Sequence, residues 1–189
     1  MLLNIPYLSQ HTAATDPYWK PRACAIVCIK LVGDFMFPGS MPSVDDLIHE
    51  GETVGGFSAR GWRHDYLAIL LRNHGVLAYN QEYRTADAAQ APQYVPSVFT
   101  EQFLEAALLK IIHEIKAGRP VIVSVPGKQG LPTETHMVVV LGIEERDGRV
   151  LGLYCHNPDT QSPEEGRNVF ISIEDFLSGW RRFCLYVES

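Results

Sequence analysis

The 189-residue chain has an apolar fraction of 46%, a charged fraction of 20% and a formal net charge of -6. This balance is typical of a globular protein, and the acidic charge excludes the basic surface that nucleic acid or anionic lipid would require. No run of about 18 apolar residues occurs, so we expect no membrane span, and the N-terminus lacks the pattern of a signal peptide. Four cysteines are too few for a disulfide framework, which favours a reducing, cytoplasmic setting.

The N-terminal half is predicted to be mainly helical. Residues 4–9 form an extended segment, and the polar residues 10–22, which include two prolines, form a loop. A helix is expected from Cys24, because apolar residues then recur at helical spacing until Pro38–Gly39. The other elements expected in this half are helices at residues 43–48, 62–73 and 101–117, a strand at 76–80 and a loop at 84–98.

The C-terminal half is predicted to be rich in strands. A tight hairpin turn is expected at Asp147–Gly148, and a short helix is expected to begin at Ser172 and end near Gly179–Trp180. The candidate strands are Pro120–Val125, His136–Glu144, Val150–His156, Asn168–Ile173 and Phe183–Glu188. The order predicts an α+β fold within one domain spanning residues 1–189, with N-terminal helices packed on a mostly antiparallel C-terminal sheet.

Cys24 is the candidate nucleophile. It lies where a loop turns into a helix, and the free amides and positive dipole end at a helix start favour a thiolate. A nearby imidazole would lower the thiol pKa further and carry the proton. The alternative is an inert core cysteine, which is how Cys28, Cys155 and Cys184 are interpreted.

His136 is the candidate general base. It begins an apolar strand, and the five apolar residues after it would hold the imidazole rigidly. Asn157 lies at the end of the next predicted strand, just before Pro158, and its side-chain oxygen is placed to accept a hydrogen bond from the imidazole. Asp159 is the alternative orienting residue. His156 is the rival base, but its side chain is expected to face away from that of Asn157 because neighbours in a strand alternate.

Gln10 is the candidate donor to an oxyanion, together with the backbone N–H of Cys24. Each of the residues Gln10, Cys24, His136 and Asn157 also has an ordinary structural interpretation, and the case for chemistry rests on the four together in that order. A structural zinc site is not favoured, because the cysteine and histidine spacings lack two close pairs. Neither a metal nor a cofactor is predicted.

Five sequence segments occur in an order that is familiar from one enzyme family: residues 5–10 (Ile-Pro-Tyr-Leu-Ser-Gln), 23–26 (Ala-Cys-Ala-Ile), 118–125 (Gly-Arg-Pro-Val-Ile-Val-Ser-Val), 136–142 (His-Met-Val-Val-Val-Leu-Gly) and 156–158 (His-Asn-Pro). The chain resembles the papain-like cysteine peptidases, and specifically the double-glycine (bacteriocin-processing) peptidases and their stand-alone relatives. Residues 173–180 resemble the segment that these relatives carry after the third catalytic residue.

The resemblance implies a papain-like α+β fold. It further implies that Cys24 is the nucleophile, His136 the base, Asn157 the orienting residue and Gln10 the oxyanion donor, with a peptide or protein as substrate. The chain departs from the family pattern at Ala25, where glycine is usual, and at Asn157, where aspartate is more common. The connection from Gln10 to Cys24 is also several residues longer than is usual in the family.

Three functions share these residues. The leading hypothesis is a thiol hydrolase that cleaves a peptide or amide bond through an acyl-enzyme. The second is an acyltransferase or transglutaminase-like enzyme, in which an amine accepts the acyl group. The third is a catalytically idle relative that only binds peptides. Because the fold is common to all three, the fold alone does not distinguish them.

Overall fold

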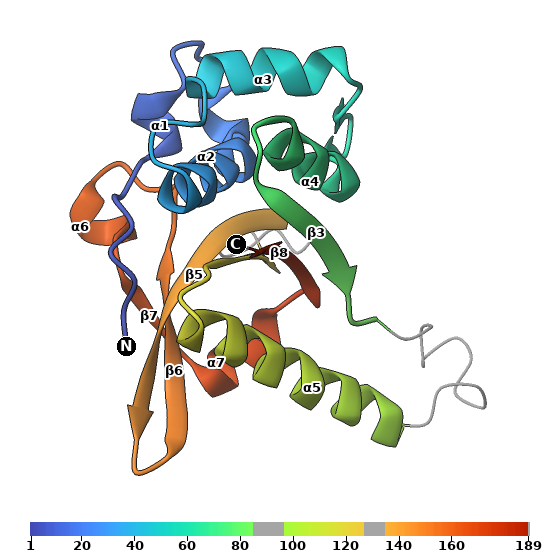
Figure 1. Ribbon diagram of the computed structural model, residues 1–189, viewed down its shortest axis with the longest axis vertical. Coiled ribbons are helices and arrows are strands. Elements are labelled where there is room, and N and C mark those ends of the chain that lie inside the picture. Colours follow the sequence, from blue (N-terminus) through green and yellow to red (C-terminus); the bar gives the residue numbers. More distant parts are fainter. Residues whose placement is uncertain (85–96, 127–134, 189) are drawn as a thin grey trace.

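The computed structural model describes residues 1–84, 97–126 and 135–188. Its centre is a six-stranded antiparallel sheet in the order β3-β8-β4-β5-β6-β7 (Figure 1). The strands of this sheet are β3 (Leu77–Glu82), β4 (Val121–Pro126), β5 (Thr135–Arg146), β6 (Arg149–His156), β7 (Val169–Ser172) and β8 (Phe183–Glu188). A separate two-stranded hairpin consists of β1 (Phe57–Ser58) and β2 (Gly61–Trp62).

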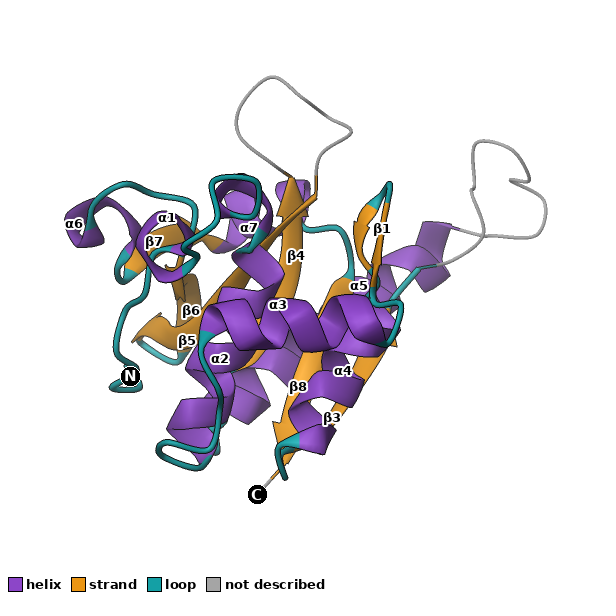
Figure 2. Ribbon diagram, turned by 90° about the horizontal axis from the view of Figure 1, so that it is seen from above, coloured by secondary structure: helices purple, strands orange, loops and turns teal. Residues whose placement is uncertain are grey.

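Helices cover both faces of the large sheet. On one face α2 and α4 pack on the strands, and α3 packs on these two helices. Helices α5 and α7 cover the opposite face (Figures 1 and 2). The helices are α1 (Gln10–Ala13), η1 (Lys20–Arg22, a 3-10 turn), α2 (Cys24–Met36), α3 (Val44–Thr53), α4 (His64–Asn73), α5 (Ser97–Lys116), α6 (Pro163–Gly166) and α7 (Ile173–Gly179).

The double cover explains why the central strands are apolar without alternation. In β5, Met137, Val139 and Leu141 join the core beneath α2, whereas Val138 and Val140 join the core beneath α5. All five are buried. Each fully buried side chain of this size contributes about 1.5–3 kcal/mol, so β5 is anchored from both sides.

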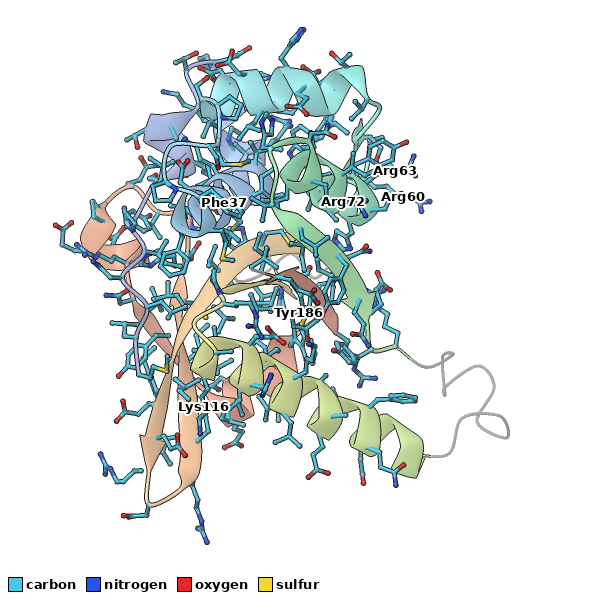
Figure 3. The ribbon with its side chains drawn as sticks, in the orientation of Figure 1. Phe37, Arg60, Arg63, Arg72, Lys116 and Tyr186 are labelled. Atoms are coloured by element: carbon cyan, nitrogen blue, oxygen red, sulfur yellow. The ribbon has the colours of Figure 1, made fainter. Side chains whose placement is uncertain are left out.

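On the face covered by α5, polar groups are buried as hydrogen-bonded clusters. Tyr186 lies between the sheet and α5 (Figure 3), where its hydroxyl contacts the hydroxyl of Tyr83 at 2.9 Å. Glu114, which is 3% exposed, accepts hydrogen bonds from Lys110 at 2.6 Å and Arg119 at 2.5 Å. The buried carboxylate is therefore neutralised by two cations, as burial of a charge requires.

Local sequence signals fix several boundaries. Ser43 and Ser172 cap α3 and α7 by accepting hydrogen bonds from the backbone N–H groups of Asp46 and Asp175. The β5–β6 hairpin turns at Asp147–Gly148, where both residues have positive φ (51° and 74°). That is the conformation which an Asp-Gly pair favours in a two-residue hairpin.

The predicted α+β fold is confirmed, with differences in detail. Residues 10–22 contain α1 and η1 rather than only loop, and Trp62 belongs to the β1–β2 hairpin rather than to α4. The long helix begins at Ser97, before the predicted Glu101. Most of the predicted 84–98 loop lies outside the described residues. Among the helices that are described, none combines the length and the apolar character needed to cross a membrane.

Candidate active site

Three elements bring the predicted residues together. Cys24 is the first residue of α2, His136 lies at the start of β5, and Asn157 directly follows β6. Helix α2 packs on β5, and β5 pairs with β6, with Val139 opposite His156 (Figure 1). The helix start and the two strand ends therefore meet at one edge of the interface between helix and sheet.

The Cys24 thiol has a pKa below its ordinary value. Burial acts to raise this pKa, but hydrogen-bonding and electrostatic interactions with His136 outweigh it. Hydrogen bonds from the backbone of Met137 and Ala25 lower the pKa further. The side chain is only partly buried. These are the features of a reactive cysteine: a stabilised thiolate that reagents can reach.

His136 has the complementary shift. Burial acts to lower its pKa, but the interaction with Cys24 outweighs burial, and Asn157 and the Asp159 carboxylate add to the rise. Its Nε2 lies 2.7 Å from Oδ1 of Asn157. Because a carbonyl oxygen only accepts, Nε2 donates to it, which leaves Nδ1 to face the thiol. The pair thus favours a thiolate beside an imidazolium.

Asn157 is itself held firmly. Its Oδ1 also accepts a hydrogen bond from the backbone N–H of Asp159 at 3.0 Å. Its backbone N–H donates to Gly166 O at 2.8 Å, and its backbone oxygen accepts from Tyr7 at 3.0 Å. The side chain that contacts His136 therefore has little freedom to turn.

Gln10 lies on the other side of the same turn. It begins α1, is 1% exposed, and donates its backbone N–H to Pro158 O at 2.9 Å. Its side-chain Nε2 donates to Asp159 Oδ1 at 3.2 Å, and the same carboxylate oxygen lies 2.8 Å from Nε2 of His11. Helix α1 packs against α2 and against η1, which ends two residues before Cys24. Asp159 therefore contacts both Gln10 and Asn157: its carboxylate accepts from Gln10, and its backbone N–H donates to Asn157.

The model of the Peptidase_C39 like family matches residues 2–184. The chain belongs to this family. Two solved structures are similar over most of their length. One is a double glycine motif protease from an AMS/PCAT transporter in complex with the leader peptide, with a TM-score of 0.55 and 14% identity over 100% of this chain and 94% of that chain. The other is the peptidase domain of Streptococcus ComA, with a TM-score of 0.54 and 16% identity over 88% of this chain and 91% of that chain. At these identities the structures show the fold, which is the papain-like α+β fold that the resemblance implied. Among curated proteins, none matches the chain significantly.

The other three cysteines of this Peptidase_C39 like chain are packing residues. Cys28, Cys155 and Cys184 are fully buried, and burial raises the pKa of each thiol, to about 12 for Cys155 and Cys184. The direction of the shift is opposite to that at Cys24. A neutral thiol in an apolar site neither attacks nor binds a metal readily.

His156 is a structural histidine. It is 0% exposed, its Nδ1 accepts a hydrogen bond from the backbone N–H of Asn168 at 3.1 Å, and its Nε2 donates to Ile5 O at 2.9 Å. Burial lowers its pKa. Because both ring nitrogens are occupied, this histidine ties the N-terminal segment to β6 and takes no part in the contact between His136 and Asn157.

The contact between His11 and Asp159 was not anticipated. A histidine in a polar segment carries no periodic signal, so the sequence does not indicate a role for His11. Asp159 was considered only as an alternative partner of His136. Within the described residues, no group of three or more histidine, cysteine or acidic side chains is arranged to hold a metal ion.

Proposed function

We propose that the chain is a cysteine peptidase-like thiol hydrolase, with Cys24 as nucleophile, His136 as general base and acid, and Asn157 as orienting residue. One observation carries the proposal. The one cysteine of the four whose pKa is lowered lies at a helix start and interacts with His136, whose ring contacts Asn157. The family match adds support, because it spans both halves of the chain.

The reaction follows from the protonation states. The Cys24 thiolate attacks the carbonyl carbon of the scissile bond, and the carbonyl π electrons move to oxygen to form a tetrahedral oxyanion. When this intermediate collapses, the C–N bond breaks and the imidazolium of His136 gives its proton to the departing amine. Neutral His136 then takes a proton from water, which attacks the thioester carbonyl. The acid departs and the thiolate and imidazolium are restored.

Gln10 would stabilise the oxyanion together with the backbone N–H of Cys24. What supports this role is the packing of α1 against α2 and η1, and the burial of Gln10. Donors of this kind act in a site with little water, where one hydrogen bond to the oxyanion contributes about 10²–10³-fold in rate.

A peptide is the substrate class that we infer. The double glycine motif protease to which this fold is similar was solved with a leader peptide. The acidic net charge of -6 of the present chain argues against nucleic acid or an anionic lipid surface as a partner.

p-Nitrophenyl acetate tests the chemistry without knowledge of the natural substrate. The wild-type protein should release a burst of nitrophenolate, and mass spectrometry should find the acetyl group on Cys24. Cys24→Ala should give neither signal, whereas Cys28→Ala should behave as the wild type if it folds. A wild-type protein that is acetylated no faster than its Cys24→Ala variant contradicts the proposal.

A second experiment identifies the bond that is cleaved and the acceptor. A peptide library is incubated with the wild type, Cys24→Ala and His136→Ala, with and without a primary amine. New peptide termini that require both residues support a peptidase. Exclusive transfer to the amine would instead favour an acyltransferase, and complete inertness towards both substrates would favour an idle, peptide-binding protein.

A further inference from the structure

Asp159 makes two side-chain contacts to α1. Its Oδ1 accepts a hydrogen bond from Nε2 of Gln10 at 3.2 Å and lies 2.8 Å from Nε2 of His11. These two partners are adjacent in sequence, about 150 residues away from Asp159. The carboxylate is largely buried, with 21% of its side chain exposed, and His11 is 17% exposed. The contact therefore joins two distant segments beside the catalytic residues.

A carboxylate fixes which way a neighbouring amide points. Ionised Asp159 offers acceptors only, so the Gln10 amide must turn its NH₂ group and not its oxygen towards it. One N–H is used by Asp159, and the amide retains a second N–H donor. A free glutamine side chain would exchange its two ends by rotation, and Asp159 removes that freedom.

The observed orientation of Gln10 has a cost that requires an explanation. Its Oε1 is buried and has no hydrogen-bond partner among the described residues. A buried, unpaired polar atom costs about 1–3 kcal/mol, and a hydrogen bond to a charged group contributes a similar amount. The contact with Asp159 is the interaction that offsets the cost and holds the amide nitrogen in place.

The same residue supports the other side of the site through its backbone. The N–H of Asp159 donates to Oδ1 of Asn157, which in turn accepts from His136. The preceding carbonyl, that of Pro158, accepts the backbone N–H of Gln10. Residues 157–159 therefore connect the orienting residue of the imidazole to the candidate oxyanion donor.

We propose that Asp159 is a positioning residue, which holds the side-chain amide of Gln10 as an oxyanion donor while His11 fixes the carboxylate. This inference rests on the proposed thiol hydrolase function. It assigns different tasks to the two halves of Asp159: the backbone N–H serves Asn157, and the side chain serves Gln10. The Asp159 charge is also the smallest of the influences that raise the pKa of His136. A substitution of the side chain should therefore mainly impair oxyanion stabilisation and largely leave the thiolate and its histidine in place.

Two reagents separate these tasks at Cys24. Iodoacetamide alkylates a thiolate by displacement at carbon and forms no oxyanion, whereas p-nitrophenyl acetate acylates it through a tetrahedral oxyanion. In Asp159→Ala we expect acylation to slow about tenfold or more, within the range for a lost oxyanion donor. The alkylation rate at the same pH should change less than about twofold. Asp159→Asn keeps an acceptor and should restore part of the acylation rate.

A double-mutant cycle tests whether Asp159 acts through Gln10. Gln10→Ala alone should slow acylation at least as much as Asp159→Ala, and the double variant should be no slower than Gln10→Ala. His11→Ala should give a smaller loss of acylation in the same direction. Asp65→Ala, an exposed aspartate at the start of α4, is the matched control and should change neither rate.

The outcomes separate this inference from the proposed function. Equal losses of acylation and alkylation in Asp159→Ala and Asp159→Asn, or no loss of either, would overturn the positioning role while Cys24 still reacts in the wild type. Additive losses in the cycle would overturn it as well. A wild-type Cys24 that reacts with neither reagent faster than a model thiol would overturn the proposed function first.

Discussion

At the scale of single residues, four side chains from α1, α2, β5 and the turn after β6 form one hydrogen-bonded and electrostatic series. Cys24 interacts with His136, His136 contacts Asn157, and the 157–159 turn leads on to Gln10. Opposite pKa shifts at Cys24 and His136 follow from their contact, because each stabilises the charged form of the other. The same type of side chain has a different role elsewhere, as the buried cysteines and His156 show.

Asn157→Ala should lower the rate of p-nitrophenyl acetate turnover without abolishing it. His136 would keep its contact with Cys24 but lose the acceptor that fixes its ring. The loss should be about tenfold or more but below the roughly 10²–10⁴-fold that a complete acid–base group contributes. Steady-state turnover measures it, with Asn80→Ala, a substitution of an exposed residue of β3, as control. An unchanged rate would show that Asn157 does not orient the base.

His156→Leu should destabilise the fold and leave the chemistry of Cys24 intact. The substitution leaves the carbonyl of Ile5 and the N–H of Asn168 without their hydrogen-bond partner, which should lower the free energy of unfolding by about 2–4 kcal/mol. Urea denaturation measures the cost, and His113→Leu on the exposed face of α5 should change stability by less than about 0.5 kcal/mol. A change in the pH profile of Cys24 alkylation in the folded variant would contradict the structural role.

The sequence could indicate Cys24, His136 and Asn157 because each lies at the end of an element with a clear pattern: a helix start, a strand start and a turn before proline. Gln10 could be named only as part of the ordered set. The pair His11–Asp159 could not be found this way. Its two members belong to an irregular turn and a four-residue helix, and only the tertiary fold brings them together.

At the scale of elements, the N-terminal segment is attached to β5 by backbone contacts. Leu2 pairs with Gly142, and the backbone N–H of Leu3 donates to Leu141 O at 2.8 Å. Gly142 allows this approach, because a Cβ there would lie 2.7 Å from a side-chain carbon of Leu2 and 2.8 Å from Met1 O. The segment continues to Gln10, so its docking also sets the position of α1.

Gly142→Ala should therefore loosen the first residues of the chain. We expect faster hydrogen exchange at the amide of Leu3 and a loss of about 1–3 kcal/mol of stability, because the new methyl group overpacks a backbone contact. Gly179→Ala is the control, since a Cβ there would meet Pro126 only at an ordinary 3.5 Å. Unchanged exchange at Leu3 would show that the close contact is not needed for docking.

The elements that sequence patterns predicted well are those with long apolar runs or clear caps, such as α2, α5 and the strands β4 to β6. The sequence pattern does not predict α1, η1, α6 or the strands β1 and β2. Each of these elements has two to four residues, too few for a periodic signal. The pattern also did not predict that α5 and α7 lie on the opposite face from α2, because a fully apolar strand does not distinguish its two faces.

At the scale of the whole molecule, the sheet separates two cores, and only the α2 side carries the candidate active site. The α5 side is held in part by Glu114. Burial acts to raise the pKa of this carboxyl, but hydrogen bonds from Arg119 and Lys110 outweigh it, so the pKa lies below its ordinary value of 4.5. A depressed pKa means that ionised Glu114 stabilises the folded state above pH 4.5, and that this stability is lost as the pH falls through the lowered pKa.

Glu114→Gln should consequently lower the free energy of unfolding by about 1–3 kcal/mol at neutral pH. The difference from the wild type should shrink as the pH falls from 4.5 towards the lowered pKa, because the carboxyl of the unfolded chain takes up a proton first and that of the folded protein only at the lowered pKa. Urea titrations at a series of pH values measure the effect, and Glu105→Gln on the exposed face of α5 should show no such pattern. A difference that stays constant with pH would show that the ionised carboxylate is not the stabilising form.

The central claim is that Cys24 and His136 share a thiolate–imidazolium pair. The most direct measurement is the rate of Cys24 alkylation by iodoacetamide as a function of pH, in the wild type and in His136→Ala. The account predicts that wild-type alkylation rises at a pH clearly below that of a model thiol, and that His136→Ala moves the rise back to higher pH. A wild-type profile that coincides with the model thiol, or with His136→Ala, would contradict it.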